Sequence, residues 1–493
     1  MRDPYPKDEM TRPMSHDTAD PTPRAPAGDA PLTPSRLAAD VQLLAPALVM
    51  TPRGPMEGYA AVVADGSFLA VGPAARLERE HPGLTPVRLP GHVLMPGFVD
   101  AHHHLTQSFG SALAFGEPSE IFSRVWVPLE GALDEESAHV AAKLAALESL
   151  RGGFTTVADA GTRAPVDVDA LASATTGAGI RCVLGLVCND ADGTTRADRA
   201  AVLAAAEKHL TRYAGADLVH PSLAVSVPEA ATADTLRDTA RLAAEAGAVV
   251  QVHVNEHLAA VERSLVRHGL RPLEYLREVG ALGPQLLAAH ATLVTPAELT
   301  LLADTGTAVS YNPVASAWKG NAVAPATTMA ERGIRFGLGT DGTRGDAFRL
   351  AEAAEFAQRL AYGLATGDSS CGAGWSWLDR GGAGGADAVG LGALTGRIAA
   401  GAAADFLLVD VSGPEMRASW DLPWELVRRG NRDQITAVFT AGRLRMWRGR
   451  AVGWDDSALV ERAAELAAEV VGRARVTRVH PTSTRARAGS AVR

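Results

Sequence analysis

Eight short apolar runs alternate with amphipathic segments between residues 93 and 394, and this alternation limits the possible folds more than any other feature. In chain order the runs are VLMPGFVDAH, FTTVADA, RCVLGLV, SLAVSV, AVVQVHV, QLLAAHA, TAVSYN and RFGLGTD. Alternating strands and helices favour a parallel sheet, and eight units favour an α/β fold closed into a (β/α)8 barrel of the TIM type. An open doubly wound sheet is the alternative, but no GxGxxG sequence follows the first run.

Two β-rich flanks surround this middle. VQLLAPALVM reads as a strand, and YAAVVADGSFLAVG reads as a hairpin that turns at Asp65–Gly66. ADFLLVDV and ITAVFTAGRLRMWRGRAV repeat the pattern near the other end, with a turn at Ala441–Gly442. Periodicity alone leaves open whether the flanks form one small β domain or two separate sheets. The predicted domains are a barrel over 93–394 and a small β-sandwich assembled from 36–92 and 395–455.

The two chain ends differ from the rest in composition. Residues 1–35 are rich in Pro, Asp and Thr and poor in large apolar side chains, so they bury too little surface to offset their ordering entropy and are predicted to be a disordered tail. Residues 456–493 are predicted to form a helix followed by a basic tail. That tail, RARVTRVHPTSTRARAGSAVR, shows no pattern and is expected to be solvated.

Composition narrows the partners and the compartment. The net charge of −9 offers no basic footprint for nucleic acid. No apolar run approaches the roughly 20 residues that a membrane-spanning helix needs, and the N-terminus has no secretory signal. Cys182, Cys188 and Cys371 form no disulfide framework and suit a reducing compartment. We therefore expect a cytoplasmic protein that acts on a small molecule and binds neither nucleic acid nor membrane.

Three adjacent histidines follow the first apolar run. Alternate residues of a strand point the same way, so His102 and His104 project together while His103 points to the opposite side. An HxH pair alone is as compatible with a structural role as with a metal site.

Polar residues recur where other predicted strands end. His253 ends the fifth run and is followed by Glu256; His290 ends the sixth, and Asp341 ends the eighth. Each separately could be a buried histidine bonded to backbone or an aspartate capping a helix. Because the carboxyl ends of barrel strands meet at one mouth, where barrel active sites lie, their joint occurrence indicates one functional site.

The motifs PGFVDAHHHL, HVNE, AAHATLVTPAEL, SYNPVASAWKGNAVAP and GLGTDG resemble the amidohydrolase superfamily. They are most similar to its aminohydrolases and chlorohydrolases of N-heterocycles, which act on guanine, 8-oxoguanine, S-adenosylhomocysteine, pterins and triazines. The resemblance covers about residues 40 to 455. It implies that both β-rich flanks join into one β-sandwich beside the barrel, and it implies a homo-oligomer.

The resemblance also implies a metal site. Its ligands would be His102, His104, His253 and Asp341, which suit one divalent ion, most simply zinc, with iron as the alternative. Two-metal members of the superfamily add a modified lysine from the fourth strand. The fourth run here, SLAVSVPEA, contains no lysine, so a single metal is predicted.

The implied reaction is hydrolytic deamination. A metal supplies hydroxide at neutral pH by lowering the pKa of its bound water to about 7. That hydroxide would attack the amino-bearing ring carbon while Glu256 protonates the neighbouring ring nitrogen as general acid. His290 would orient the nucleophile, and Asp341 would pass a proton to the departing ammonia.

Other residues near the predicted mouth are candidates for substrate binding. They are Gln107, Trp126, Asn312, Trp318 and Lys319. Gln107 could instead bond a loop, and Trp126 could belong to the core.

Two departures from the family leave the substrate undetermined. Tyr311 stands where many relatives carry His, and the segment GTRGDAFR carries no recognised substrate signature. Arg344, Asp346 and Arg349 could therefore read the periphery of the substrate or merely cap the following helix.

Other activities remain as alternatives. The same site could displace chloride or an alkylamine, or open a cyclic amide, because pocket contacts set the leaving group. A non-catalytic scaffold is the alternative from another functional class, and it would not need every ligand and Glu256. A Ser-His-Asp hydrolase fits poorly, because no GxSxG sequence follows a strand.

Overall fold

The computed structural model describes residues 32–117, 121–191, 197–367 and 374–479. Nearly all of the predicted N-terminal tail, Cys371 and the end of the basic C-terminal tail lie outside the described residues. Residues 34–493 group into one compact unit. Within the described ranges, no helix is both long and apolar enough to cross a membrane.

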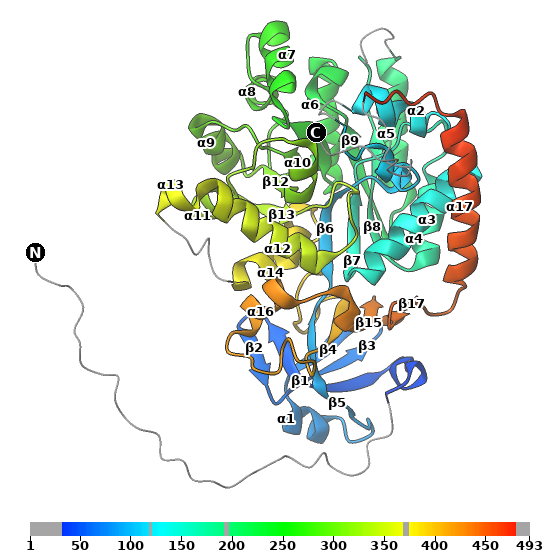
Figure 1. The fold of residues 1–493 in the computed structure, drawn as a ribbon, viewed down its shortest axis with the longest axis vertical. Helices are drawn as coiled ribbons and strands as arrows, with labels where there is room; N and C mark the ends of the chain where they lie inside the picture. The colour runs from blue at the N-terminus through cyan, green and yellow to red at the C-terminus, as the bar shows by residue number, and fades with distance from the viewer. Residues whose placement is uncertain (1–31, 118–120, 192–196, 368–373, 480–493) are drawn as a thin grey trace, which may run out of the picture. The chain divides into compact units, whose positions relative to one another are not determined.

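Eight parallel strands form the predicted barrel, in the order in which they occur along the chain (Figure 1). They are β6 (Phe98–His103), β7 (Phe154–Asp159), β8 (Arg181–Val187), β9 (Val219–Val225), β10 (Val250–Val254), β11 (Leu286–His290), β12 (Ala308–Tyr311) and β13 (Phe336–Leu338). The residues after β13 reach back to β6, since the Asp341 amide donates to the His102 carbonyl at 2.8 Å. The predicted (β/α)8 barrel is confirmed.

Helices connect the strands and pack around the sheet (Figure 1). Helices α1 to α9 are α1 (Ala74–Glu80), α2 (Val127–Glu130), α3 (Glu135–Arg151), α4 (Asp169–Ala178), α5 (Arg199–Arg212), α6 (Ala233–Ala246), α7 (Leu258–His268), α8 (Pro272–Glu278) and α9 (Pro296–Thr305). The others are α10 (Pro313–Lys319), α11 (Ala326–Glu331), α12 (Ala347–Gln358), α13 (Leu364–Thr366), α14 (Gly374–Gly381), α15 (Ala383–Ala388), α16 (Leu422–Arg429) and α17 (Asp456–Arg473).

The two β-rich flanks form a single second sheet. Its strands are β1 (Gln42–Thr51), β2 (Gly54–Glu57), β3 (Tyr59–Ala64), β4 (Ser67–Pro73), β5 (Val87–Pro96), β14 (Phe406–Asp410), β15 (Ile435–Thr440), β16 (Arg443–Trp447) and β17 (Arg450–Ala451). The chain ends meet where β5 pairs with β14 in antiparallel register, from Pro96 opposite Phe406 to His92 opposite Asp410. One composite sheet, rather than two separate ones, therefore holds both ends.

Both predicted hairpin turns lie where the sequence places them. Asp65 and Gly66 join β3 to β4 with φ of 49° and 74°, and Ala441 and Gly442 join β15 to β16 with φ of 48° and 70°. Two successive left-handed residues are what a two-residue turn needs to match the twist of its strands. Ala404 links the two turns. Its amide donates to the Gly66 carbonyl, and its carbonyl accepts from the Gly442 amide.

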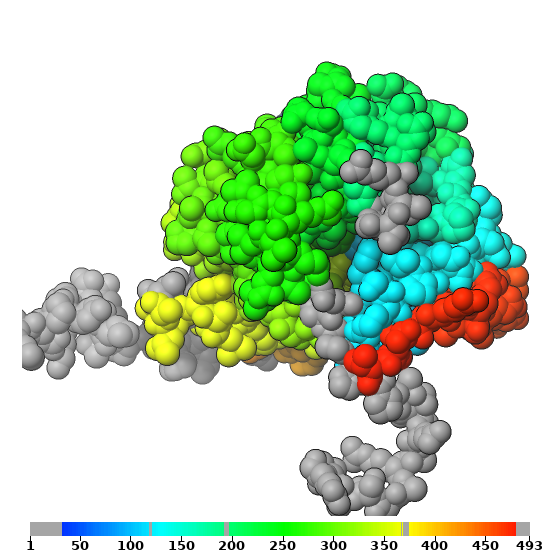
Figure 2. Space-filling view, turned by 90° about the horizontal axis from the view of Figure 1, so that it is seen from above, coloured from blue at the N-terminus to red at the C-terminus, as the bar shows by residue number. Residues whose placement is uncertain are grey.

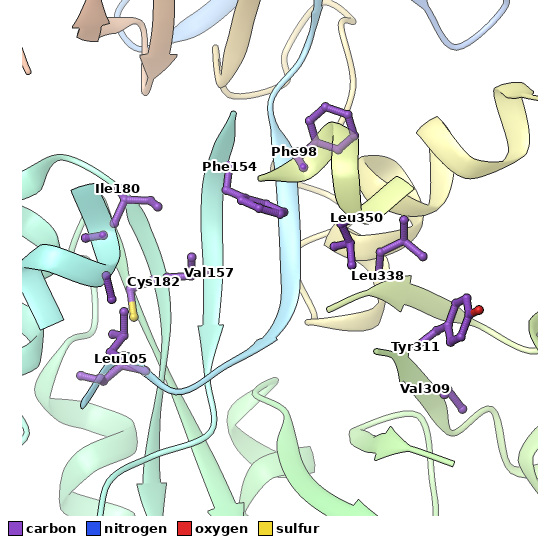
Figure 3. Packing of buried hydrophobic residues seen from close by; sticks show 14 of the residues in the cluster. Phe98, Leu105, Phe154, Val157, Ile180, Cys182, Val309, Tyr311, Leu338 and Leu350 are labelled. Carbon is purple, nitrogen blue, oxygen red and sulfur yellow. The ribbon is translucent and has the colours of Figure 1, made fainter. Parts of the chain in front are cut away.

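Aromatic side chains pack together where β6 and β7 begin. Phe98 and Phe154 lie with ring centroids 6.3 Å apart, and Phe98 also meets Phe348 edge-on at 5.4 Å. Figure 3 shows Phe98 and Phe154 beside Leu338 and Leu350. This packing gives the strands a fixed base, so their opposite ends can hold polar side chains in defined positions.

A buried ion pair joins the barrel to the composite sheet. Arg181 at the start of β8 binds the Asp405 carboxylate at 2.9 Å, and both side chains are buried. Asp405 also accepts from the Thr395 hydroxyl at 2.7 Å and from the Ala441 amide at 2.6 Å.

Asp405→Asn should destabilise the protein strongly, because it leaves the buried Arg181 charge without its counter-charge. We expect the free energy of unfolding in urea to fall by about 3–5 kcal/mol. Glu136→Gln is the matched control: Glu136 pairs with Arg462 at the surface, and its loss should cost at most about 1 kcal/mol. Equal small losses in the two variants would contradict a structural role for the buried pair.

His220 next to this ion pair makes stability depend on pH. Burial and the Arg181 charge lower the pKa of His220 from 6.5 to about 4. As pH falls from 6.5 towards 4, the unfolded state binds a proton that the folded state does not. The free energy of unfolding therefore keeps its full value above pH 6.5 and falls by up to about 3 kcal/mol as the pH decreases through this window. His220→Gln should lose less between pH 7 and pH 4 than the wild type in urea titrations, and parallel losses would exclude this contribution.

Candidate active site

Five of the predicted site residues converge at the carboxyl end of the barrel sheet. His102 comes from β6, His253 from β10 and His290 from the end of β11, while His104 and Asp341 follow β6 and β13. Figure 2 looks onto the upper face of the molecule in Figure 1 and shows it hollowed among the green and cyan segments.

The side chains form one compact cluster. A ligand atom from each of His102, His253, His290 and Asp341 lies within 4.8 Å of the others. His104 joins them, since its Nε2 lies 3.3 Å from His253 Nε2 and 3.2 Å from Asp341 Oδ1. The cluster therefore contains all four predicted ligands together with His290.

The backbone at several strand ends adopts the left-handed region, which non-glycine residues rarely occupy. Asn255, His290, Ala291 and Asp341 have φ of 50°, 74°, 46° and 55°. Such conformations are uncommon outside glycine and cluster at functional sites. These conformations turn the chain sharply where the strands end. The residue types at these positions do not predict them.

Several imidazole nitrogens in the cluster are buried without a hydrogen-bond partner among the described residues. They include both ring nitrogens of His102 and Nε2 of His290. Buried polar atoms are otherwise almost always satisfied. Imidazole and carboxylate donors gathered around one point fit a divalent first-row metal ion, which would use such nitrogens as ligands.

Electrostatics keep the cluster in the protonation state that binds metal. Burial lowers the pKa of His104 and His253, and it lowers the pKa of His290 to about 4, so these imidazoles stay neutral at pH 7. Burial opposes ionisation of Asp341, but the Lys319 charge and the neighbouring His102 and His104 imidazoles together outweigh it and hold the pKa of this carboxyl well below its usual range.

Glu256 lies beside the cluster and is bridged to it by Lys319. The Lys319 ammonium donates to Glu256 Oε1 and to Asp341 Oδ2, each at 2.7 Å. Burial opposes ionisation of Glu256, but the neighbouring His290 imidazole and the Lys319 ammonium together lower its pKa below the ordinary value. The Thr292 hydroxyl donates to the Glu256 carbonyl at 2.6 Å and fixes this part of the chain.

A cavity of about 480 Å³ opens at the cluster. His104, His253, Glu256 and Asp341 line it. Of the predicted substrate-binding residues, Gln107, Trp126 and Lys319 also line it.

The other two predicted substrate-binding residues lie differently. Asn312 is buried behind His290, with its Nδ2 3.2 Å from His290 Nδ1. Trp318 lines a smaller adjoining pocket and meets the Phe115 ring edge-on at 4.5 Å.

The residues in which the sequence departs from the family have structural contacts. Tyr311 is buried and its hydroxyl donates to the Ala354 carbonyl at 3.1 Å, away from the cavity. Asp346 caps α12 by accepting from the Arg349 amide at 3.2 Å. For Asp346, the structure therefore shows the helix cap.

Some cavity residues were missed by sequence reasoning. Arg163, Arg263 and Val479 line the cavity, and Arg163 binds the buried Glu130 carboxylate at 2.7 Å. Arg163 follows β7 by four residues, so extending the strand-end argument to the loops would have found it. No comparable signal marks Val479, which lies in the stretch expected to be solvated.

Comparison with known proteins places the chain in a family. The model of the amidohydrolase family matches residues 93–445. A 5-methylthioadenosine/S-adenosylhomocysteine deaminase of Syntrophobacter fumaroxidans is 28% identical over 83% of this chain and 92% of its own length. A 5'-deoxyadenosine deaminase of Methanopyrus kandleri is 30% identical over 77% of this chain and 86% of its own length.

Solved structures agree with the fold. An adenosine deaminase from Xanthomonas campestris with bound zinc superposes with a TM-score of 0.80 at 25% identity, covering 87% of this chain and 98% of that one. A zinc complex of atrazine chlorohydrolase from Arthrobacter aurescens gives a TM-score of 0.75 at 20% identity, over 86% of this chain and 99% of that one, and shows the shared fold alone.

These findings confirm the resemblance and the enzyme class predicted from the motifs, a hydrolase acting on carbon–nitrogen bonds. The relatives that match along most of their length are deaminases by name, and the family model spans the whole barrel with part of the composite sheet. This chain belongs to the amidohydrolase family.

Proposed function

We propose that the protein is a metal-dependent hydrolytic deaminase of an aminated N-heterocycle, with adenosine-type nucleosides as the first class to test. The observation that carries this proposal is the Glu256 carboxylate beside a cluster of four histidines and Asp341, with His104, His253, Glu256 and Asp341 lining one cavity. The names of the relatives support an aminopurine ring as the reacting group.

The metal would be held by His102, His104, His253 and Asp341. Zinc is the simplest choice for this donor set, and iron is the alternative. When bound, such an ion makes water nucleophilic at neutral pH. Strand β9 contributes no lysine, which supports a single ion.

The chain's own residues would move the protons. Glu256, ionised at rest, would take one proton from the attacking water and deliver it to the ring nitrogen beside the amino-bearing carbon, so that charge does not accumulate on the ring when water adds. Asp341 would take the remaining proton of the added hydroxyl as the carbon–oxygen double bond forms and pass it to the amino group, which leaves as ammonia. The products are the oxo-heterocycle and ammonia.

His290 would orient the attacking water. Asn312 positions His290, since its amide lies 3.2 Å from His290 Nδ1 and its Oδ1 accepts from the Ser310 hydroxyl at 2.7 Å. This leaves His290 Nε2 on the side of Glu256, at 3.8 Å from its Oε2. Asn312 would therefore act through His290 rather than on substrate.

The cavity has the size and lining for a flat ring with a substituent. Its volume of about 480 Å³ lies in the range of small-molecule sites. Trp126 would stack on the ring, and Gln107 and Lys319 would bind its polar edge.

The compartment and the assembly remain predictions. Cys182 and Cys188 are buried free thiols, which supports a reducing cytoplasm. A homo-oligomer rests on the family resemblance alone.

Ammonia release across a panel of heterocycles tests the proposal. The panel contains adenosine, 5'-deoxyadenosine, 5'-methylthioadenosine, S-adenosylhomocysteine, guanine, 8-oxoguanine, pterin and amino- and chlorotriazines. Protein stripped with a chelator is the background, and it is reloaded with zinc or with iron(II). We expect release from adenosine-type compounds that disappears on stripping and returns on reloading. Chloride release without ammonia would replace the proposal with dehalogenation, and no bound metal would overturn the site.

A further inference from the structure

We propose that residues 477–479, here called the C-terminal strap, form the outer wall of the substrate cavity and bind the substituent that the heterocycle carries. This inference rests on the proposed function and deepens it. The strap follows α17, whose red ribbon in Figure 1 continues as a segment that passes over α2. The strap was expected to be solvated, whereas it is bound to the barrel.

Reciprocal backbone and side-chain bonds anchor the strap. The Thr477 amide donates to the Arg124 carbonyl at 2.9 Å, and Arg124 Nη1 donates to the Thr477 carbonyl at 3.2 Å. Glu117 accepts from Arg478 Nε at 3.2 Å and from the Val479 amide at 3.0 Å. These contacts join residues more than three hundred positions apart in the chain.

Glu117 makes this anchor strong. Its side chain is fully buried and also binds Arg124 at 2.7 Å. A buried carboxylate with two guanidinium partners loses much stabilisation when one is removed, because the charge remains buried. Removal of the Arg478 side chain should therefore weaken the attachment of the strap.

The anchor connects to the catalytic end of the cavity. Arg478 Nη2 donates to the Phe115 carbonyl at 3.1 Å, and the Phe115 ring packs against Trp318. Trp318 precedes Lys319, which binds Glu256. The strap therefore supports, through Phe115, the segment that contains Trp318 and Lys319.

Val479 places the strap in the cavity itself. It lines the space that Glu256 and His253 line, together with Ile121 and Phe122. Val479 is 56% exposed, so it lies at the open rim rather than at the floor. A ring that reacts at the floor would direct its substituent towards this rim. The strap should therefore act on substituted rings, such as nucleosides, and leave the bare base unaffected.

Arg478→Ala tests the wall, with Arg475→Ala as matched control. Arg475 lies three residues earlier, is exposed and makes no ion pair among the described residues. Loss of one charge-assisted anchor should raise KM for the best nucleoside by about tenfold or more. The value of kcat and the kinetics of the corresponding bare base should change less than twofold. The control should match the wild type.

Val479→Trp provides a second variant that leaves the anchor intact. A larger side chain at the rim should raise KM for nucleosides and leave the bare base unaffected. Unchanged selectivity in both Arg478→Ala and Val479→Trp would overturn the proposal.

Hydrogen exchange at the Thr477 and Val479 amides measures the attachment independently of the reaction. Exchange should be slow in the wild type and in Arg475→Ala, and fast in Arg478→Ala. If these amides exchange fast in Arg478→Ala but KM for the nucleoside is unchanged, the strap has only a structural role and the proposal that it binds the substituent is wrong. If the wild type deaminates nothing, the proposed function fails. Calorimetry then measures the affinity of the same variants for nucleoside and for bare base. Weaker binding of the nucleoside alone would support the wall, and equal effects on both would overturn it.

Discussion

Replacing Glu256 by glutamine is expected to lower kcat for ammonia release by about 10²–10⁴-fold, because glutamine cannot donate the proton that the ring nitrogen requires. The amide keeps the shape of the side chain, and Glu256 is outside the proposed ligand set. Metal content should therefore stay at the wild-type value, and KM should change little. Steady-state kinetics with the best compound of the panel, together with metal analysis of the same preparation, provide the measurement.

Glu262→Gln is the control for this variant. It makes the same substitution six residues further on, at an exposed position of α7. Its activity should equal that of the wild type. If Glu256→Gln retained full kcat, another group would have to supply the proton and the assigned role of Glu256 would be wrong.

Asp341→Asn is expected to remove most of the bound metal and, with it, the ammonia release. Asp341 is the one anionic member of the proposed ligand set, and an amide is a much poorer ligand for a divalent ion than a carboxylate. Metal affinity should fall by more than about 100-fold, beyond what is lost when only a supporting residue is changed. Competition with a chromogenic chelator measures this affinity directly.

The control here is Asp304→Asn, an exposed aspartate on α9 that should leave metal and activity unchanged. Asp341 also lies at a left-handed position with φ of 55°, which asparagine tolerates well, so the fold should survive. Wild-type metal content in Asp341→Asn would place the metal site elsewhere.

Much of the fold could be predicted from local sequence patterns. The short apolar runs, the Asp65–Gly66 and Ala441–Gly442 turns and the strand-to-helix alternation each depend on a few neighbouring residues, and each was predicted correctly. Whether the two β-rich flanks pair with each other depends on a contact between β5 and β14, hundreds of residues apart, which periodicity cannot encode.

The site shows the same division. His102 and His104 could be placed on one side of a strand from their spacing alone. His253, His290 and Asp341 could be brought to the same mouth once the barrel was inferred, because its parallel strands all end there. These residues lie where the fold class requires them, and their roles as ligands remain the proposal to be tested.

By itself, the sequence determined the barrel, the two hairpin turns of the composite sheet and which strand ends bear metal-binding side chains. Each of these features depends on the spacing of residues within one strand or one turn, or on the regular alternation of strands and helices. Only the tertiary structure decided that Lys319 bridges Glu256 and Asp341, that Asn312 supports His290, and that Arg478 anchors on Glu117. Glu117 and Arg478 are 361 positions apart. Contacts of this kind depend on the paths of loops between elements, and spacing along the chain carries distance information only within one regular element.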